Sequence, residues 1–149
     1  MPFRADLDEF VRFGGKGFLI GENRSQVIST ALQKNIPFFF DEKYDGKKIY
    51  IGNEIDLFVN SRDDVFFVNW VDTNTNQVSF FFESDYHRDK RLRTPLNDLL
   101  TSLDIEINFL QSGDCVINRW DNGSCVFSFS FFGERMVSFY AHNYALEKL

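Results

Sequence analysis

Cysteine, histidine, methionine and proline are scarce in this sequence, whose 149 residues include 2 Cys, 2 His, 2 Met and 3 Pro. Two cysteines are too few for the disulfide framework of a small secreted domain. His87 and His142 have no second histidine or cysteine at the spacing of a metal site, and no Cys-x-x-Cys occurs. The composition therefore predicts a chain without structural disulfides, metal ligands or another cofactor.

The two cysteines are not expected to pair with each other. Asn122-Gly123, between two alternating apolar runs, is a strong signal for a hairpin turn. A two-residue turn at that position sets Trp120 opposite Cys125, so Cys115 lies several residues further along the neighbouring strand. Cys125 then shares a face with large apolar residues, which predicts a buried thiol rather than a reactive one.

Long apolar runs are also missing. None approaches the roughly 18 residues that a membrane-spanning helix needs. Residues 1–8 are polar and acidic, unlike the basic and then apolar start of a signal peptide. We therefore expect no membrane segment and a reducing, cytoplasmic location.

Motifs for catalysis are absent as well. The glycines at positions 14, 15, 17 and 21 are not followed by the Gly-Lys-Ser/Thr of a phosphate-binding loop, and no Gly-x-Ser-x-Gly occurs. The acidic clusters at 41–45, 63–64 and 85–89 lie in predicted turns or linkers. An acid–base pair needs burial to separate its pKa values, and turns do not provide it. The sequence predicts no catalytic residue and no enzyme activity.

The charge balance disfavours a nucleic-acid partner. The net charge is −6, and an acidic surface repels phosphate backbones. The same sign suits a basic partner such as the active cleft of a nuclease, although an acidic surface is also common in ordinary cytosolic proteins. The one basic cluster, Arg88–Arg93, is short and mixed with acids, and we interpret it as a solvated linker.

Aromatic residues, in contrast, are abundant. They make up 17% of the chain and include 19 Phe. Phe, Tyr and Trp favour the half-buried surface of a β-sheet, so the composition indicates strands. A core packed with phenylalanine accounts for this share, and so does an aromatic recognition face, because aromatic residues are enriched where proteins meet.

The sequence contains two similar units about half a chain length apart. The first begins with a helix capped by Asn23, with Val27, Ile28, Ala31 and Leu32 on its apolar side. The second begins with a helix that Thr94 caps and Pro95 enters, with a stripe of leucines. We predict one domain over 1–149 that contains internal repeats at about 19–82 and 94–145, joined by a linker at 83–93.

Strand signals follow each helix in the same order. The first unit predicts strands at 36–40, 48–51, 55–59 and 65–70, and one more strand at 77–82 precedes the linker. The second unit predicts strands at 105–110, 115–120, 125–132 and 136–140. A short helix at Asp6–Phe13 is expected to stop at Gly14-Gly15. The fold class is α+β, with tandem α-β-β-β(-β) repeats that form an antiparallel sheet backed by helices.

Alternation along one strand indicates which face of this sheet is covered. Phe127, Phe129 and Phe131 share one face, and Ser128 and Ser130 share the other. The helices are expected to bury the phenylalanines. The serine-bearing face stays open and offers a broad docking platform.

This layout resembles the β-lactamase inhibitory protein and a group of small bacterial immunity proteins that neutralise secreted polymorphic toxins. The resemblance lies in Leu19–Ile28, which ends in the capped helix, and in the hairpin Lys48–Phe58. Ile51 between Tyr50 and Gly52 departs from the Tyr-Gly-x-Ile/Leu-Glu-x-x-Phe pattern of such proteins. The resemblance implies a cytoplasmic protein that binds one cognate toxin domain and blocks its active site without a cofactor.

Candidate contact residues follow from the open face and the hairpin tips. They are Tyr44, Asp45, Tyr50, Asp56, Arg119, Asp121 and Tyr140. Aromatic side chains beside acids suit a basic enzymatic cleft. Two alternatives stay open: an adaptor, or a small-ligand-binding module that uses the same face or a Phe-lined pocket between helix and sheet. An exposed edge strand also leaves a homodimer open.

Overall fold

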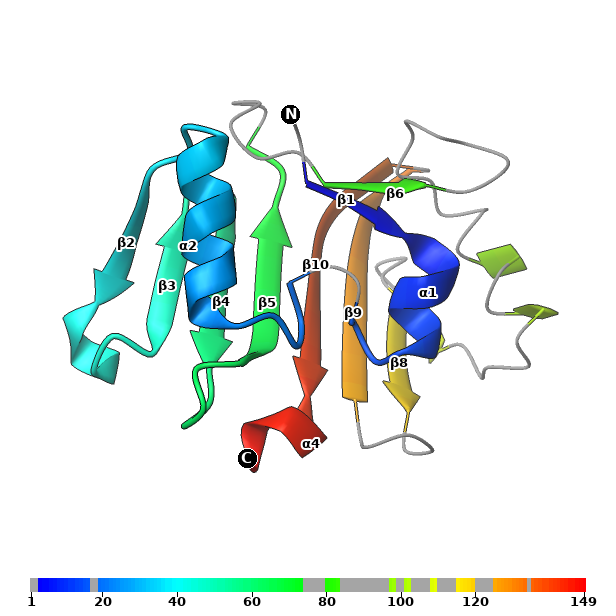
Figure 1. Cartoon of the computed structure of the whole chain (residues 1–149). Helices are drawn as coiled ribbons and strands as arrows, with labels where there is room; N and C mark the ends of the chain where they lie inside the picture. The colour runs from blue at the N-terminus through cyan, green and yellow to red at the C-terminus, as the bar shows by residue number, and fades with distance from the viewer. Residues whose placement is uncertain are drawn as a thin grey trace.

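A computed structural model describes residues 3–16, 19–73, 80–83, 97–98, 101–102, 108–109, 115–119, 125–133 and 135–149. Its main element is an eight-stranded antiparallel sheet with the order β2-β3-β4-β5-β10-β9-β8-β7 (Figure 1). The strands are β2 (Phe38–Asp41), β3 (Lys48–Ile51), β4 (Ile55–Val59), β5 (Val65–Val71), β7 (Asn108–Phe109), β8 (Cys115–Arg119), β9 (Cys125–Phe132) and β10 (Arg135–Asn143). Together with the helices, this sheet makes the chain an α+β protein.

The sheet consists of two meanders that meet at its centre. β2 to β5 follow one another in both sequence and space, and so do β7 to β10. The last strands of the two meanders, β5 and β10, pair with each other. Most strands lie where the sequence predicts them, and β10 runs three residues further than expected, to Asn143. The strand predicted at 77–82 corresponds to β6 (Phe80–Glu83), which pairs in parallel with β1 (Phe3–Asp6) outside the main sheet.

Helices lie on one face of the sheet. α2 (Arg24–Gln33) lies over β3 and β4, and α1 (Leu7–Arg12) lies over the half that contains β8 and β9 (Figure 1). Asn23 caps α2 as predicted: its side chain accepts from the backbone of the first turn, and the Gln26 side chain accepts in return from the Asn23 N–H at 2.9 Å. The short helices η1 (Glu42–Tyr44) and α4 (Tyr144–Glu147) lie in a loop and at the C-terminus. In the segment predicted as the second repeat's helix, residues 97–98 and 101–102 are helical.

α1 ends where glycine lets the backbone turn. Gly14 and Gly15 have φ of +66° and +88°, values that L-residues with side chains rarely adopt. Close packing adds a second reason, because a Cβ on Gly15 would lie 2.9 Å from the Ile20 side chain. The predicted helix stop is therefore confirmed, although the helix starts at Leu7 because Asp6 still belongs to β1.

The core lies between the helices and the sheet. One cross-strand row, Ile49, Leu57, Val68, Ala141 and Phe127, is fully buried along the helix-covered face. The Phe10 ring of α1 lies 5.4 Å from that of Phe127 and 5.7 Å from that of Phe139. Aromatic rings from α1 and the sheet thus fill this half of the core, whereas Val27 and Ala31 of α2 fill the other.

Two details of the sequence prediction need correction. Leu32, predicted on the buried stripe of α2, is 62% exposed, because the helix presents only Val27 and Ala31 fully to the sheet. Cys125 lies opposite Arg119 rather than Trp120, so the observed register differs by one residue from the predicted one. Cys115 lies opposite Phe129, so the two cysteines are not cross-strand partners, as predicted. Cys125 is a buried free thiol.

Candidate functional site

The face of the sheet opposite α1 and α2 carries the candidate site, and we call it the open face. Strict alternation places its side chains there: on β3, Ile49 and Ile51 are buried under α2, while Lys48 and Tyr50 point the other way. β9 follows the same rule, since Phe127 and Phe129 are buried while Ser128 is half-buried on the open face. The predicted assignment of the two faces is confirmed at this strand.

One row of residues crosses the open face from the edge strand β2 to β8. Each member lies directly opposite the next on the neighbouring strand. We call it the open-face row; it consists of Phe39, Tyr50, Asp56, Asn69, Tyr140, Ser128 and Val116. Phe39, on the edge strand β2, is 59% exposed, and the other members are half-buried. The row combines aromatic, acidic and amide groups in a single line.

Contacts within the open-face row hold its side chains in place. The Phe39 and Tyr50 rings stack with centroids 4.6 Å apart and an interplanar angle of 18°. The Tyr50 hydroxyl donates to Asp41 Oδ2 at 3.3 Å. Asn69 Nδ2 donates to Asp56 Oδ1 at 3.0 Å. Side chains that are oriented before binding lose less conformational entropy when a partner arrives.

A lysine stands in the middle of the neighbouring aromatic residues. Lys48 Nζ lies 5.4 Å from the ring centre of Tyr44, 4.9 Å from that of Tyr50 and 5.3 Å from that of Phe58. It also lies 3.9 Å from Asp56 Oδ2, and its side chain is 18% exposed. Interaction with Tyr50, joined by the Asp56 carboxylate and opposed by partial burial, raises the pKa of Lys48 above its ordinary value. The side chain is therefore a fixed cation that the surrounding rings stabilise.

The aromatic surface continues across the centre of the sheet. Phe67 on β5 stacks on Tyr140 of β10, with ring centroids 5.9 Å apart. His142 lies edge-on to Phe67 and stacks on Tyr144 at 4.0 Å. Its Nε2 lies 2.8 Å from Glu147 Oε2, which ties α4 to the end of β10. Ring contacts from Phe58 on β4 through Phe67 to His142 on β10 thus form an aromatic surface beside the open-face row.

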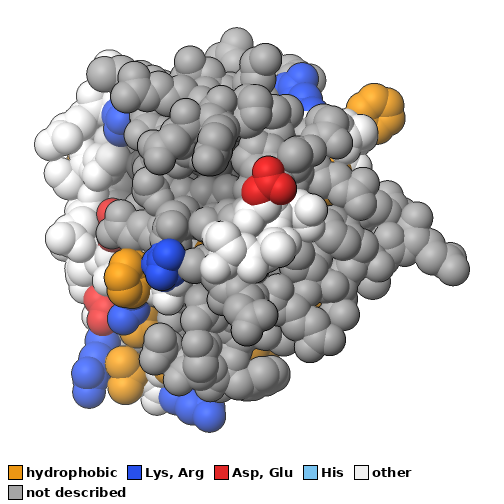
Figure 2. Space-filling model, turned by 90° about the vertical axis from the view of Figure 1, so that its right-hand side faces the viewer, with side chains coloured by type: hydrophobic (Ala, Val, Ile, Leu, Met, Phe, Trp, Pro, Cys, Tyr) orange, Lys and Arg blue, Asp and Glu red, His pale blue; other side chains and the backbone are white. Residues whose placement is uncertain are grey.

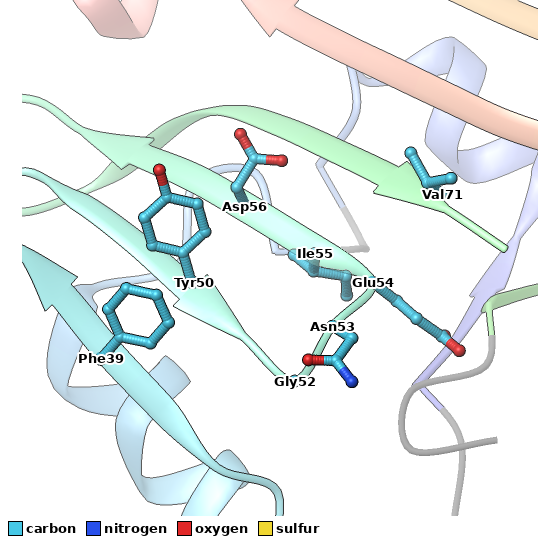
Figure 3. A pocket seen from close by; sticks show the side chains of 8 residues that line it. All are labelled: Phe39, Tyr50, Gly52, Asn53, Glu54, Ile55, Asp56 and Val71. Atoms are coloured by element: carbon cyan, nitrogen blue, oxygen red, sulfur yellow. The ribbon is translucent and has the colours of Figure 1, made fainter. Parts of the chain in front are cut away.

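A hollow of about 300 Å³ lies at the turn between β3 and β4. It is lined by Phe39, Tyr50, Gly52, Asn53, Glu54, Ile55, Asp56 and Val71. Figure 3 shows Phe39 and Tyr50 side by side on neighbouring strands, Asp56 beyond Tyr50 on the next strand, and Glu54 extending away from the two rings. Glu54 is 4% exposed, and its Oε1 accepts from Thr73 Oγ1 at 3.0 Å. The hollow therefore has aromatic residues at one end and carboxylates beside it.

The predicted contact residues fall into three groups. Tyr50, Asp56 and Tyr140 are all members of the open-face row. Tyr44 and Asp45 are exposed in and just after η1, where Tyr44 packs edge-on against Phe58 at 5.4 Å and joins the rings around Lys48. The third group is Arg119 and Asp121. Arg119 is the last residue of β8, and the structure does not describe its side chain; Asp121 lies outside the described residues.

Sequence reasoning missed several residues of this face. Phe39, Lys48, Phe58, Phe67, Asn69 and His142 are brought to it by the strand register. A signal for some of them was present, because Lys48 and Phe58 alternate with the buried isoleucines and leucines of their own strands. His142 alternates in the same way with the buried Ala141 and Asn143, but it was missed because the predicted strand ended at residue 140.

The described side chains do not form a metal-binding cluster. Within the described ranges, no three His, Cys, Asp or Glu side chains come together to hold a metal ion. Seen from the side of β8 (Figure 2), described Lys and Arg side chains lie mostly towards the margins of the surface. The open-face row and its hollow instead offer aromatic planes, hydrogen-bonding groups and carboxylates, a combination suited to recognition of a cationic group.

No described helix is long and apolar enough to cross a membrane. Comparison of the chain with protein-family models, with curated proteins and with solved structures found no match.

Proposed function

We propose that this protein is a non-catalytic binding protein of a polymorphic toxin system, an immunity protein that holds a cognate toxin domain on its open face and blocks the toxin's active site. The observation that carries the proposal is the open-face row. Seven residues lie in register across seven strands on the face opposite the helices, and six of them are aromatic or polar. Such a face is broad enough for a protein partner.

The chemistry of the face fits an inhibitor of a basic enzyme. Interfaces draw most of their binding energy from a few aromatic and charged anchors near their centre. Tyr50 and Tyr140 are such anchors, and Asp56 lies between them in the open-face row. The net charge of −6 also favours rapid encounter with a positively charged cleft.

The proposal includes the architecture and the location of the protein. We infer that the two meanders descend from a tandem repeat, each preceded by its own helix. The strand order supports this, because it runs outward from the β5–β10 pair through equivalent strands on both sides. An inhibitor that protects the cell producing the toxin is expected to act in the cytoplasm and without a cofactor.

A second candidate function is a small-ligand-binding or adaptor module. The hollow of about 300 Å³ beside Phe39 and Tyr50 favours it, because small-molecule sites combine apolar walls with a few polar groups. The predicted Phe-lined pocket under the helices gains less support. Phe10 and Phe127 lie in ring contact there, and Phe129 and Phe139 pack with them.

A pull-down from cells that carry the native locus tests the main proposal. A tagged copy of the full chain serves as bait, and a copy with Tyr50, Asp56 and Tyr140 all replaced by alanine serves as its matched control. One stoichiometric partner with an enzymatic domain, held by the first bait and lost with the second, is the expected result. Recovery of no partner rejects the immunity function, and equal recovery by both baits rejects the open face as its site.

A further inference from the structure

The hollow beside β3 and β4 has a sharper chemical character than the rest of the open face. Its lining includes two carboxylates, Asp56 and Glu54, and no basic side chain. Its aromatic end is the stacked pair of Phe39 and Tyr50, of which Phe39 is largely exposed. Anions are repelled from such a site, whereas a cation gains from its two negative charges.

Asp56 is held in place yet keeps room for another hydrogen bond. Its Oδ1 accepts from Asn69 Nδ2 at 3.0 Å, which fixes the plane of the carboxylate. Its Oδ2 lies 3.9 Å from Lys48 Nζ, beyond hydrogen-bonding distance, and the side chain is 25% exposed. Lys48 itself is held among the rings of Tyr44, Tyr50 and Phe58. The carboxylate therefore retains acceptor capacity for a donor that enters from the hollow.

The shape of the site favours one cation over others. The rings of Phe39 and Tyr50 stack face against face, with centroids 4.6 Å apart, so the pair presents a flat outer ring face rather than a cage around a point. A planar guanidinium stacks on such a ring face and donates two parallel hydrogen bonds to a carboxylate, whereas an ammonium group does neither. Glu54, held by Thr73 at 3.0 Å, adds a second negative charge in the same hollow.

We propose that this hollow receives an arginine side chain of the protein partner, with the guanidinium on Asp56 and its plane against the Phe39–Tyr50 stack. The inference rests on the proposed function for the existence of a partner, and it names the group by which that partner is anchored. It also assigns a role to Phe39, an exposed aromatic ring on an edge strand.

The site is testable without the partner, by NMR titration of the ¹⁵N-labelled full chain with N-acetylarginine amide. N-acetylcitrulline amide, which has the same shape without the charge, and N-acetyllysine amide are the matched probes. A ligand of this size is expected to bind with a Kd of about 1 mM, so a titration to about 20 mM reaches saturation. Saturable shifts confined to the backbone amides of residues 52–56 and their neighbours, for the arginine probe alone, are the expected result.

Two variants localise the binding. Asp56→Asn and Phe39→Ala are each expected to weaken the arginine probe by about fivefold or more. Glu42→Gln, an exposed acid in η1, and Phe132→Ala, an exposed phenylalanine 82% accessible at the end of β9, are the matched controls and leave binding unchanged. Because the Phe39 ring is exposed, Phe39→Ala keeps the test decisive even if Asp56→Asn perturbs the fold.

Three outcomes overturn the site: no saturable shift at residues 52–56, equal shifts with the citrulline probe, or equal shifts with the lysine probe. These outcomes are distinct from failure of the proposed function. A partner recovered in the pull-down while the probes fail leaves an immunity protein anchored elsewhere. Probe binding without a partner leaves a guanidinium site in a protein of another class.

Discussion

Asn69 and Tyr140 are direct cross-strand partners at the junction of the two meanders. On the open face, the two meanders meet at the β5–β10 pair. Through it, the acidic and aromatic part of the open-face row on β2 to β4 continues into the serine-bearing part on β9. A partner docked over the junction therefore contacts both halves at once.

Replacement of Tyr140 by alanine should weaken partner binding strongly. The Tyr140 ring is central on the open face and stacks on Phe67, so its loss removes an anchor that is already ordered. The expected loss is about 2 kcal/mol, roughly 30-fold in Kd. Isothermal titration calorimetry with the recovered partner measures it. Phe132→Ala, at a highly exposed ring away from the row, is the control, and an equal effect of both changes would contradict a central role for Tyr140.

Lys48→Met should destabilise the fold although it replaces a charge with an apolar group of similar length. The substitution removes the cation from three surrounding rings and leaves Asp56 without its nearest positive charge. The expected decrease in the free energy of unfolding is about 1 kcal/mol, measured by urea denaturation. Lys43→Met, at an exposed position of η1, should stay within about 0.5 kcal/mol of the parent. An unchanged or increased stability of Lys48→Met would show that the rings gain nothing from the charge.

The ion pair between Lys47 and Asp63 should make stability depend on pH in the acid range. Lys47 Nζ lies 2.8 Å from Asp63 Oδ1, and this interaction lowers the pKa of Asp63 from its ordinary 3.8. A carboxyl whose folded-state pKa is depressed contributes stability that is present above its unfolded pKa and is lost as the pH falls through the folded pKa.

Asp63→Asn should therefore lose stability at neutral pH and lose less than the parent on acidification. Asn tolerates the left-handed backbone at this position, where φ is +62°, so the loop conformation is kept. Urea midpoints at about pH 7 and about pH 3 measure the difference. Lys47→Gln, which removes the other half of the pair, should flatten the pH dependence in the same way. A parallel pH profile for parent and Asp63→Asn would reject the assignment.

The packing of α1 on the sheet should depend on one ring. Phe10 is fully buried against Phe127 and Phe139, so Phe10→Ala is expected to cost about 3–5 kcal/mol. Phe13, one turn further along, is 57% exposed, and Phe13→Ala should change the free energy of unfolding by less than about 0.5 kcal/mol. Hydrogen exchange adds a local readout, because the α1 amides should lose protection first in Phe10→Ala. Similar losses for the two variants would contradict the observed packing.

The strands and the helix-covered face of the sheet were predictable because residues that are close in the sequence determine them. Alternation in β9 separates phenylalanines from serines, and the Asn23 cap with Gln26 three residues later marks the start of α2. The same rule extends to Tyr50 and Asp56, which is why both were among the predicted contact residues. Register within each hairpin was predictable only to about one residue, as the Cys125–Arg119 pair shows.

Non-local pairing accounts for what the sequence did not reveal. Nothing near Asn69 indicates that Tyr140 is its neighbour, and nothing in Phe3–Asp6 indicates a parallel partner in β6. The environment of Lys48 likewise requires a loop and two strands to be placed together, since Tyr44, Tyr50 and Phe58 each come from a different element. Such contacts depend on topology, which periodicity within one segment does not specify.

α2 offers a direct comparison of the helical pattern with the observed packing. Val27 and Leu32 both fall on its predicted apolar stripe, but Val27 is fully buried and Leu32 is 62% exposed. Val27→Ala should therefore lower the free energy of unfolding by about 1–3 kcal/mol, because it removes buried methyl groups. Leu32→Gln should change it by less than about 0.5 kcal/mol, since Gln has a similar helix propensity and little apolar contact is lost. Urea denaturation of both variants makes the comparison. A larger loss for Leu32→Gln than for Val27→Ala would mean that a further surface covers this side of α2 in solution.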